Sequence, residues 1–257
     1  MLTEKRQEEI VRLVQERESM TVAELKDILQ ASESTIRRDI VTLDKEGRLI
    51  KVFGGAIAVQ SVQIVNQELS VMQKKELQTA EKQTIAQYAA SLIEPDDCVY
   101  LDAGTTTGWM IEYIREPQAT YITNAVDHAK RLAQKGFHVI LIGGEMKGTT
   151  EAVVGAEAVV NIQKYHFSKG FFGTNGIDQK MGFTTPDINE ALVKQSAVRN
   201  TQLNHRYMLA TGQKFGKICA VTFSGFDGIT ILTEEMPEEP FWKNVTIKCV
   251  TDKEKSL

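Results

Sequence analysis

Four short segments rich in glycine, threonine and asparagine hold the residues of this 257-residue chain that are best suited to binding an anion. The segments are Asp102-Ala103-Gly104-Thr105-Thr106-Thr107, Thr123-Asn124-Ala125, Gly143-Gly144-Glu145 and Gly173-Thr174-Asn175-Gly176. Backbone amides, hydroxyl groups and the positive end of a helix all bind phosphate oxygens. Any one segment alone is equally compatible with an ordinary turn. The first segment has neither the Walker spacing nor the G-x-G-x-x-G spacing, which disfavours a nucleotide ligand.

The elements around these segments predict that all four meet at one edge of a sheet. Short β-prone runs cover Cys98–Asp102, Thr120–Thr123, His138–Ile142, Gly170–Phe172, Arg206–Ala210 and Ile229–Leu232, and helical patterns occur around Thr107–Ile114, Val126–Lys135, Ala156–Ile162 and Asn189–Asn200. Such alternation predicts a doubly wound, mostly parallel α/β domain. Ligands of these sheets bind beyond the carboxyl ends of the strands. We therefore expect one shared crevice rather than four unrelated turns.

A second group of candidate residues lies on a helix predicted from Ser32 to about Lys45. At 100° per residue, Ile36, Ile40 and Leu43 fall on one face and point to the core. The opposite face carries Ser34, Arg37, Arg38, Val41 and Lys45. Arginine can form two parallel hydrogen bonds with guanine or phosphate, and hydroxyl groups reach phosphates or base edges. This face is therefore suited to the major groove of DNA.

The surrounding elements have the proportions of a winged helix-turn-helix. Thr3 can cap an earlier helix, and Thr21-Val22-Ala23-Glu24 has the form of a capping box that opens a second one. Gly54-Gly55 separates two β-prone stretches, which predicts a hairpin wing from which Lys51 can reach the DNA backbone. Charge does not support DNA binding, because the chain carries −4 and its first 58 residues hold ten Lys and Arg against eleven Asp and Glu. A protein-interaction module with a solvated, charged face remains the alternative.

The N-terminal residues resemble the signature of DeoR-type bacterial transcriptional regulators. The run Ser32-Glu33-Ser34-Thr35-Ile36-Arg37-Arg38-Asp39-Ile40 is followed by Leu43, Gly47 and Gly54-Gly55-Ala56. In that family the S-x-x-T-[IV]-R-R-D-L segment is the recognition helix, and G-G-A follows the wing. The match covers residues 3 to 58 and departs at Ile40, where leucine is usual. The DNA-binding candidates are accordingly Ser34, Thr35, Arg37, Arg38, Lys45 and Lys51.

The C-terminal region resembles the sensor half of the same regulators. The matching pieces are Leu101-Asp102-Ala103-Gly104-Thr105-Thr106-Thr107, Thr123-Asn124, Leu141-Ile142-Gly143-Gly144-Glu145, Gly173-Thr174-Asn175-Gly176-Ile177, Glu190-Ala191 and Lys214-Phe215-Gly216. The resemblance implies a fold like ribose-5-phosphate isomerase, a sugar-phosphate effector, and similarity to the repressors of lactose or fructose phosphotransferase operons. The effector-binding candidates are Asp102, Gly104, Thr105, Thr106, Thr107, Thr123, Asn124, Gly144, Glu145, Thr174, Asn175, Glu190 and Lys214. These regulators usually carry aspartate where this chain has Thr211, which bears on the identity of the effector.

Catalysis is the main alternative that the isomerase-like fold raises. By resemblance, Glu190 falls near the position of the general base. The acidic loop of the isomerase is here Gly173-Thr174-Asn175-Gly176, without a carboxylate, and its lysine-glycine stretch is Gly182-Phe183-Thr184-Thr185. A lone carboxylate without these partners is expected to bind a ligand and not to catalyse proton transfer. We therefore expect no enzymatic activity, and an active sugar-phosphate isomerase with a fused DNA-binding head is the rival hypothesis.

The remaining features concern domains, compartment and partners. We expect a winged helix-turn-helix in residues 1–58, a partly helical linker in 59–78 and a sugar-phosphate sensor domain in 79–257. The chain lacks a bilayer-spanning run and a secretory signal, and its three cysteines have no close spacing, which predicts a cytoplasmic protein. The four histidines show no metal-ligand spacing, so neither a metal nor a cofactor is expected. The expected partners are double-stranded operator DNA, the effector and further copies of the chain in a homodimer or homotetramer, because one head covers half of an operator.

Overall fold

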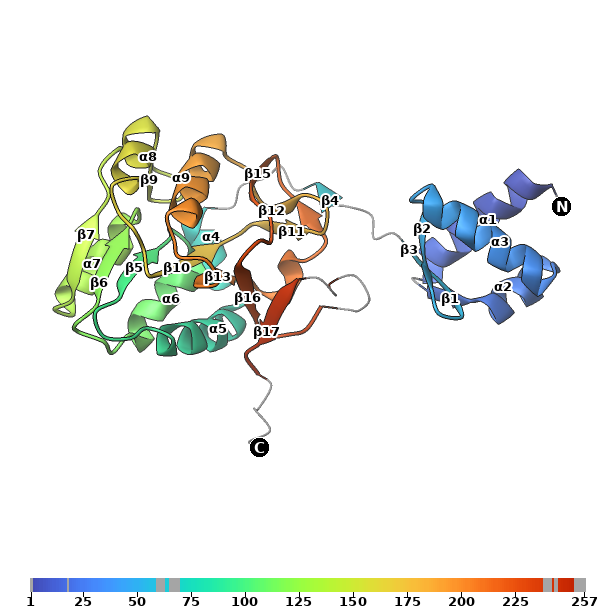
Figure 1. Cartoon of the computed structure of the whole chain (residues 1–257), viewed down its shortest axis with the longest axis horizontal. Helices are drawn as coiled ribbons and strands as arrows, with labels where there is room; N and C mark the ends of the chain where they lie inside the picture. The colour runs from blue at the N-terminus through green and yellow to red at the C-terminus, as the bar shows by residue number, and fades with distance from the viewer. Residues whose placement is uncertain are drawn as a thin grey trace. The chain divides into compact units, whose positions relative to one another are not determined.

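The computed structural model describes residues 2–17, 19–58, 63–64, 70–237, 242 and 245–251. The chain forms two compact units, Met1–Val62 and Gln63–Leu257 (Figure 1). Within the predicted linker 59–78, residues 59–62 and 65–69 lie outside the described residues, and the described remainder belongs to the second unit. No helix in the described part of the chain is long and apolar enough to cross a membrane.

The first unit packs three helices against a small antiparallel sheet. Its elements are α1 (Thr3–Arg17), β1 (Ser19–Thr21), α2 (Val22–Leu29), α3 (Glu33–Lys45), β2 (Leu49–Val52) and β3 (Gly55–Ala58), with the strand order β1-β3-β2. Thr21 forms the predicted capping box with Glu24 at the start of α2. Gly55 lets β1 pair closely with β3, since a Cβ at Gly55 would lie 2.3 Å from the Met20 carbonyl oxygen. The predicted winged helix-turn-helix is confirmed, and β1 adds a strand that was not predicted.

A seven-stranded parallel sheet forms the centre of the second unit. Its strand order is β17-β16-β13-β10-β5-β6-β7, and every neighbouring pair is parallel. The strands are β5 (Cys98–Leu101), β6 (Thr120–Thr123), β7 (His138–Leu141), β10 (Lys169–Gly173), β13 (Arg206–Leu209), β16 (Ile229–Thr233) and β17 (Thr246–Cys249). The β-prone runs predicted all of these except β17. The predicted doubly wound α/β architecture is therefore confirmed.

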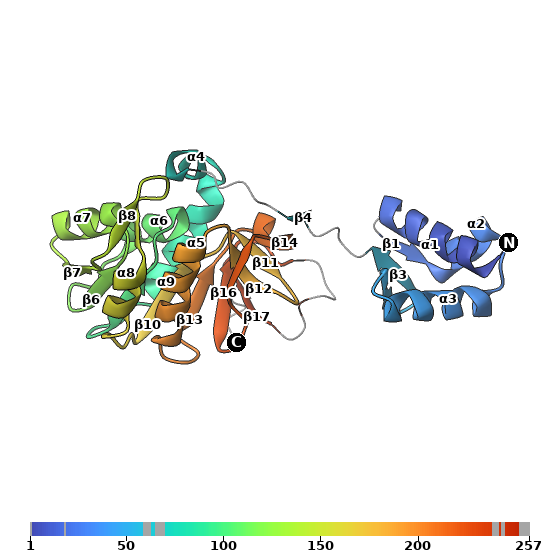
Figure 2. The ribbon, with the colours of Figure 1, turned by 90° about the horizontal axis from the view of Figure 1, so that it is seen from above.

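Helices cover both faces of this sheet (Figure 2). The helices on one face are α5 (Thr79–Ser91), α6 (Thr105–Tyr113) and α7 (Val126–Gln134), and those on the other are α8 (Ala156–Ile162) and α9 (Ile188–Arg199). Each face of the sheet has its own hydrophobic core, because successive side chains along a strand point to opposite faces. In β5, for example, Tyr100 packs with the α8 and α9 side, whereas Val99 and Leu101 pack with the α5 and α6 side.

Several short strands of the second unit were not predicted, whereas helix α4 falls within the linker that was expected to be partly helical. An antiparallel sheet contains β11 (Gly176–Asp178), β12 (Gly182–Thr185) and β15 (Val221–Ser224), in that order. Two further pairs are β8 (Glu145–Lys147) with β9 (Ala152–Val154), and β4 (Gln63–Ile64) with β14 (Lys217–Ile218). A six-residue helix, α4 (Val71–Glu76), precedes α5, and a 3₁₀ turn, η1 (Gly212–Lys214), follows β13. Both α4 and η1 lie at the crevice described next.

Candidate functional site

The parallel sheet reverses its direction of growth between β5 and β10. From β5 the chain adds β6 and then β7 on one side, and it later adds β10, β13, β16 and β17 on the other. A crevice forms beyond the carboxyl ends of the strands at such a switch point, because the flanking connections leave in opposite directions. Here Asp102 follows β5 and Gly173 ends β10, and the Gly173 amide donates a 2.9 Å hydrogen bond to Asp102 Oδ2.

A cavity of about 300 Å³ lies at this switch point. Seven effector-binding candidates line it, namely Gly104, Thr105, Thr106, Thr174, Asn175, Glu190 and Lys214. Gly104 begins α6 without any side-chain cap, so the amides of the first turn of α6 are not capped by a side chain. The structure thus brings together the segments after β5 and β10, the start of α9 and the turn after β13. Of the four segments expected to share one crevice, Thr123-Asn124-Ala125 and Gly143-Gly144-Glu145 do not line it.

Five lysines give this crevice a strongly positive lining. They are Lys74, Lys82, Lys194, Lys214 and Lys217, of which only Lys214 was a candidate from the sequence. Lys214 has no hydrogen bond or ion pair from its ammonium group to the described part of the chain. Burial, followed by the charges of Lys74, Lys217 and Lys82, lowers the pKa of Lys214 to about 8. An anion bound beside Lys214 would relieve this repulsion.

Lys82 connects the crevice to α4. Its ammonium group donates hydrogen bonds to the Leu77 carbonyl at 2.6 Å and to the Lys74 carbonyl at the carboxyl end of α4. Burial and the nearby Lys74 charge lower the pKa of Lys82. Gln78, one residue beyond Leu77, accepts a 2.8 Å hydrogen bond from the Thr211 hydroxyl. The segment before α5 is therefore part of the crevice wall.

A buried ion pair lies beneath the crevice. Lys194, on α9, pairs with Asp102 Oδ2 and also donates to the Gly173 carbonyl at 3.2 Å. The Asp102 side chain is 1% exposed and that of Lys194 is 6% exposed. The pair joins α9 to the carboxyl ends of both switch-point strands, and it holds the first turn of α6 and the 173–175 loop at a fixed spacing.

Glu190 lies one helical turn before Lys194 and faces the same crevice. Its Oε1 accepts a 2.6 Å hydrogen bond from the Thr150 hydroxyl and lies 3.3 Å from the ammonium group of Lys147. Asp187 caps α9 and lies 3.2 Å from Lys147. Glu190 thus anchors the loop between β8 and β9 to the crevice.

Six effector-binding candidates do not line the crevice. Asp102, Thr107, Thr123 and Asn124 are buried, and Gly144 and Glu145 lie at the start of the β8 hairpin. The Asn124 side chain bonds within the protein, because Oδ1 accepts from the Tyr100 hydroxyl and the Ala103 amide while Nδ2 donates to the Val153 carbonyl. Asn124 therefore supports the turn formed by residues 103–106. Direct contact of these six residues with a ligand stays a prediction.

The sequence gives only a weak indication that the other lysines belong to the crevice. Lys194 follows Glu190 by four residues and therefore shares its helix face. Lys74 and Lys82 lie in or beside the expected linker, and nothing in their local sequence indicates that α4 folds back over the sheet edge. Their contribution depends on the tertiary fold.

His128, on α7, is buried and bonds to the backbone of Gly104, one of the residues that line the crevice. Burial, together with the charge of Arg131 and a smaller contribution from Lys75, lowers the pKa of its imidazole to about 4, against the opposing effects of Asp127 and the Gly104 backbone. Since the folded pKa is below the unfolded value of 6.5, the neutral ring supports folding above pH 6.5, and this support is lost as the pH falls towards 4.

We expect the free energy of unfolding of the second unit to drop by about 2–3 kcal/mol more in the native chain than in His128→Gln between pH 7 and pH 4.5. Urea unfolding followed by tryptophan fluorescence measures this, because both tryptophans of the chain, Trp109 and Trp242, belong to the second unit. Carboxylates that titrate in the same range affect both proteins equally. Parallel losses in the two proteins would contradict the assignment to His128.

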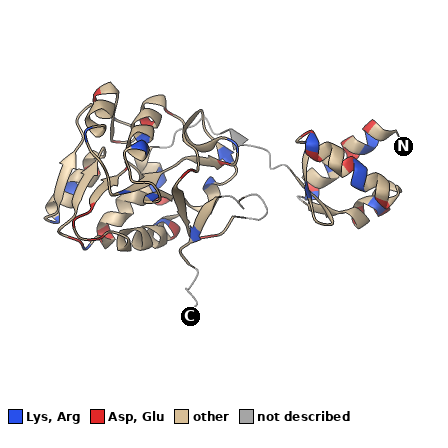
Figure 3. Ribbon diagram, in the orientation of Figure 1, with Lys and Arg blue, Asp and Glu red and all other residues tan. Residues whose placement is uncertain are grey.

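The DNA-binding candidates of the first unit lie on α3 and on β2, and Figure 3 marks the basic positions of this unit in blue. Ser34, Arg37, Arg38, Lys45 and Lys51 are exposed, and Thr35 is half-buried. Arg37 is paired with Glu33 at 2.6 Å, whereas Arg38 has no side-chain partner in the described part of the chain. The hydroxyl groups of Ser34 and Thr35 lie 3.0 and 2.8 Å from that of the capping residue Ser32.

Asp39 holds α3 in place from its inner side. It is 3% exposed, and its Oδ2 lies 2.6 Å from Nε of Arg6 on α1. Gln7 donates a further 3.2 Å hydrogen bond to Oδ1. Asp39 therefore fixes α3 against α1, whereas the preceding Arg37 and Arg38 point outward.

The two units match two models of one protein family. The DeoR-like helix-turn-helix domain matches residues 6–62, and the DeoR C terminal sensor domain matches residues 77–235. The chain belongs to the DeoR family. This DeoR-family regulator is 39% identical over 254 residues to a Bacillus subtilis (strain 168) protein named an uncharacterized HTH-type transcriptional regulator, FruR, covering 97% of this chain and 99% of that protein. The predicted DeoR-type transcriptional regulator is confirmed.

Other relatives have more specific names. The lactose phosphotransferase system repressor of Staphylococcus aureus (strain NCTC 8325 / PS 47) is 35% identical over 237 residues, covering 91% of this chain and 92% of that protein. Among solved structures, ribose 5 phosphate isomerase A from Neisseria gonorrhoeae is similar over 52% of each chain, with 10% identity and a TM-score of 0.38. A structural likeness at this level says nothing about activity.

Proposed function

We propose that this DeoR-family regulator is a cytoplasmic repressor of an operon for the uptake or metabolism of a sugar. A phosphorylated sugar, bound in the crevice at the β5–β10 switch point, changes its affinity for operator DNA. Relatives named as lactose phosphotransferase system repressors support the choice of operon. Because one helix-turn-helix covers half of an operator, the proposal includes a homodimer or homotetramer.

The observation that carries the proposal is the cluster of lysines in the crevice. Lys214 has no carboxylate partner in the described part of the chain, and Lys82 is partnered by carbonyl oxygens. A dianionic phosphate would neutralise both charges, while the uncapped first turn of α6 offers amide donors for the remaining oxygens. Glu190 and Asn175, which also line the crevice, suit the hydroxyl groups of a sugar.

We propose that the crevice binds without catalysis. Glu190 already accepts a hydrogen bond from Thr150 and lies beside Lys147, so its carboxylate anchors the β8–β9 loop. A general base would need a free carboxylate within reach of the substrate carbon. The rival hypothesis, an active isomerase, is tested with ribose 5-phosphate and related sugar phosphates in a coupled assay. Turnover that is lost in Glu190→Gln would favour the isomerase.

A gel-shift assay on the DNA upstream of the chain's own coding region tests the function, with a panel of sugar phosphates titrated at constant salt. We expect specific binding that one sugar phosphate alters, and in Lys214→Gln we expect unchanged DNA binding with at least a tenfold weaker response to that sugar phosphate. Lys180→Gln, an exposed lysine outside the crevice lining, is the matched control. An undiminished response in Lys214→Gln would place the effector elsewhere.

The response is also expected to depend on pH. Lys214 binds an anion best when it is protonated, and its pKa of about 8 means that it loses its proton between pH 7 and pH 9. Sugar phosphates are already dianionic in this range, since their second pKa is about 6. Effector affinity should therefore fall by up to about tenfold from pH 7 to pH 9, as measured by titration calorimetry. The fall should be smaller in Lys214→Gln, and an equal fall in both proteins would contradict the role of Lys214.

A further inference from the structure

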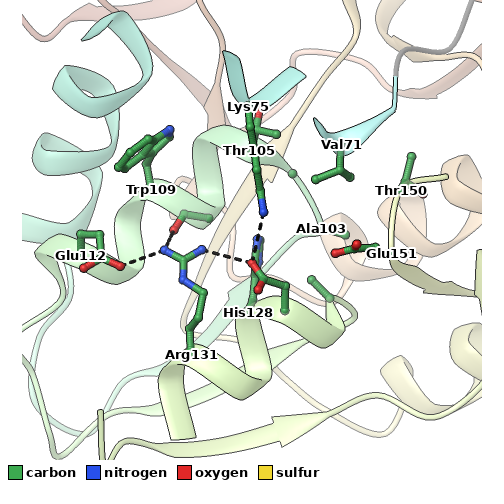
Figure 4. A pocket seen from close by; sticks show the side chains of 14 residues that line it. Val71, Lys75, Ala103, Thr105, Trp109, Glu112, His128, Arg131, Thr150 and Glu151 are labelled. Atoms are coloured by element: carbon green, nitrogen blue, oxygen red, sulfur yellow. Dashed lines mark hydrogen bonds and ion pairs between the residues drawn. The ribbon is translucent and has the colours of Figure 1, made fainter. Parts of the chain in front are cut away.

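A second cavity, of about 340 Å³, lies between α4, α6 and α7 (Figure 4). It is separate from the lysine-lined crevice but shares one wall with it, formed by the turn from Ala103 to Thr105 together with Val71 and Thr150. Small-molecule sites in proteins measure about 300–1,000 Å³, so this cavity suits a ligand of monosaccharide size. No part of the proposed function uses it.

The charges of this cavity differ from those of the crevice. Its cations are paired: Arg131 lies 3.0 Å from Glu112 and 3.3 Å from Asp127, and Lys75 reaches across to Asp127 at 3.8 Å (Figure 4). Glu151 adds a third carboxylate. The lining therefore carries one more negative than positive charge, which disfavours a phosphate here.

Two polar groups of the cavity have no partner in the described part of the chain. The Glu151 carboxylate forms no hydrogen bond or ion pair there, although its backbone is held at a φ of +54° and accepts from the Val126 amide. His128 is 5% exposed, and its Nδ1 is buried without a hydrogen-bond partner. The half-buried Glu151 carboxylate can accept hydrogen bonds from the hydroxyl groups of a ligand, whereas Nδ1 of His128 is closed off from the cavity.

The rest of the lining supplies an aromatic ring and small apolar side chains. Trp109, on α6, is half-buried at the edge of the cavity, opposite Val71 and Ala103 (Figure 4). A sugar ring has apolar C–H faces that pack on an indole, and hydroxyl groups around its rim that bond to carboxylates and guanidinium groups. Inorganic phosphate lacks the apolar face and a hydrophobic ligand lacks the hydroxyl groups, while the phosphate charge of a nucleotide is disfavoured by the excess of carboxylates.

We propose that this cavity is a second small-molecule site, which takes an uncharged, polyhydroxylated ligand of monosaccharide size. Such a ligand packs on Trp109 and bonds to Glu151, Glu112 and Arg131. The site is coupled to the crevice through α4, because Lys74 lines the crevice whereas the next residue, Lys75, lines this cavity. The regulator would then sense a free sugar and a phosphorylated one at neighbouring sites.

Tryptophan fluorescence separates the two sites. In Trp242→Phe, the remaining Trp109 reports the second cavity; in Trp109→Phe, the remaining Trp242, which packs 5.0 Å from Phe215 beside Lys214, reports the crevice. The probes are unphosphorylated fructose, galactose, tagatose and glucose, with inorganic phosphate as the charged comparison. We expect one neutral sugar to change Trp109 fluorescence saturably, with an affinity at least tenfold weaker in Glu151→Asn and unaltered in Lys214→Gln.

Glu151→Asn removes the carboxylate while keeping a residue that tolerates a positive φ, so the fold is expected to persist. The proposal would be overturned if no neutral sugar changed Trp109 fluorescence at concentrations up to about 50 mM. It would also be overturned if the change were lost in Lys214→Gln rather than in Glu151→Asn, or if inorganic phosphate competed for the site. Failure of sugar phosphates to alter DNA binding would refute the proposed function and leave this site standing.

Discussion

Replacing Lys194 by methionine is expected to destabilise the second unit by about 3–5 kcal/mol, since it leaves the carboxylate of Asp102 buried without a cation. The Asp102 side chain is 1% exposed, and its Oδ1 already has no hydrogen-bond partner. With Lys194 removed, the Gly173 amide would be the main group stabilising that charge. Urea unfolding followed by tryptophan fluorescence reports this unit alone, because the first unit contains no tryptophan.

The double variant Asp102→Asn with Lys194→Met distinguishes an unpaired charge from lost packing. An asparagine oxygen can still accept from the Gly173 amide, and no buried charge remains. We expect the double variant to recover more than half of the stability that Lys194→Met loses. A loss below 1 kcal/mol in the single variant would show that the carboxylate is reached by water. A double variant as unstable as the single one would assign the loss to packing on α9.

The architecture of both units could be predicted because it depends on local periodicity. In α3 the apolar residues recur at helical spacing, and the same spacing turns Arg37 and Arg38 outward. The alternation of β-prone and helical runs sufficed for a doubly wound sheet, and the switch point then places the segments after β5 and β10 together. Strand β17 was not predicted because it lies beyond the last helical pattern. Strands β11, β12 and β15 were not predicted because they are short and antiparallel.

The chemistry of the crevice could be predicted only in part. Glycine and threonine at strand ends indicated an anion site, but four of its five lysines come from α4, α5, α9 and β14, whose approach to the sheet edge is tertiary. Asn124 shows another limit, because its strand-end position did not indicate the hydrogen bonds that its side chain forms with Tyr100, Ala103 and Val153. Local sequence identifies polar residues, but it does not reveal which of them the fold has already satisfied.

Arg38→Ala is expected to weaken operator binding by about 10- to 100-fold, corresponding to about 1–3 kcal/mol for one bidentate arginine contact. Arg38 is exposed on α3 and has no side-chain partner in the described residues, so its guanidinium group is free for a base or phosphate. Arg37 must first leave Glu33, which lies 2.6 Å away, and its replacement by alanine should therefore cost less.

The salt dependence of binding tells the two kinds of contact apart. If Arg38 binds a phosphate, the slope of log affinity against log salt should become shallower by about 1 in Arg38→Ala, whereas a base contact leaves the slope nearly unchanged and relaxes sequence preference. Arg12→Ala is the matched control, because Arg12 lies on α1 and is paired with Glu9 and Glu16. Filter binding at four salt concentrations supplies both slope and affinity. Equal effects of Arg12→Ala and Arg38→Ala would mean that α3 is not the helix in the groove, and the wing with Lys51 would become the principal DNA contact.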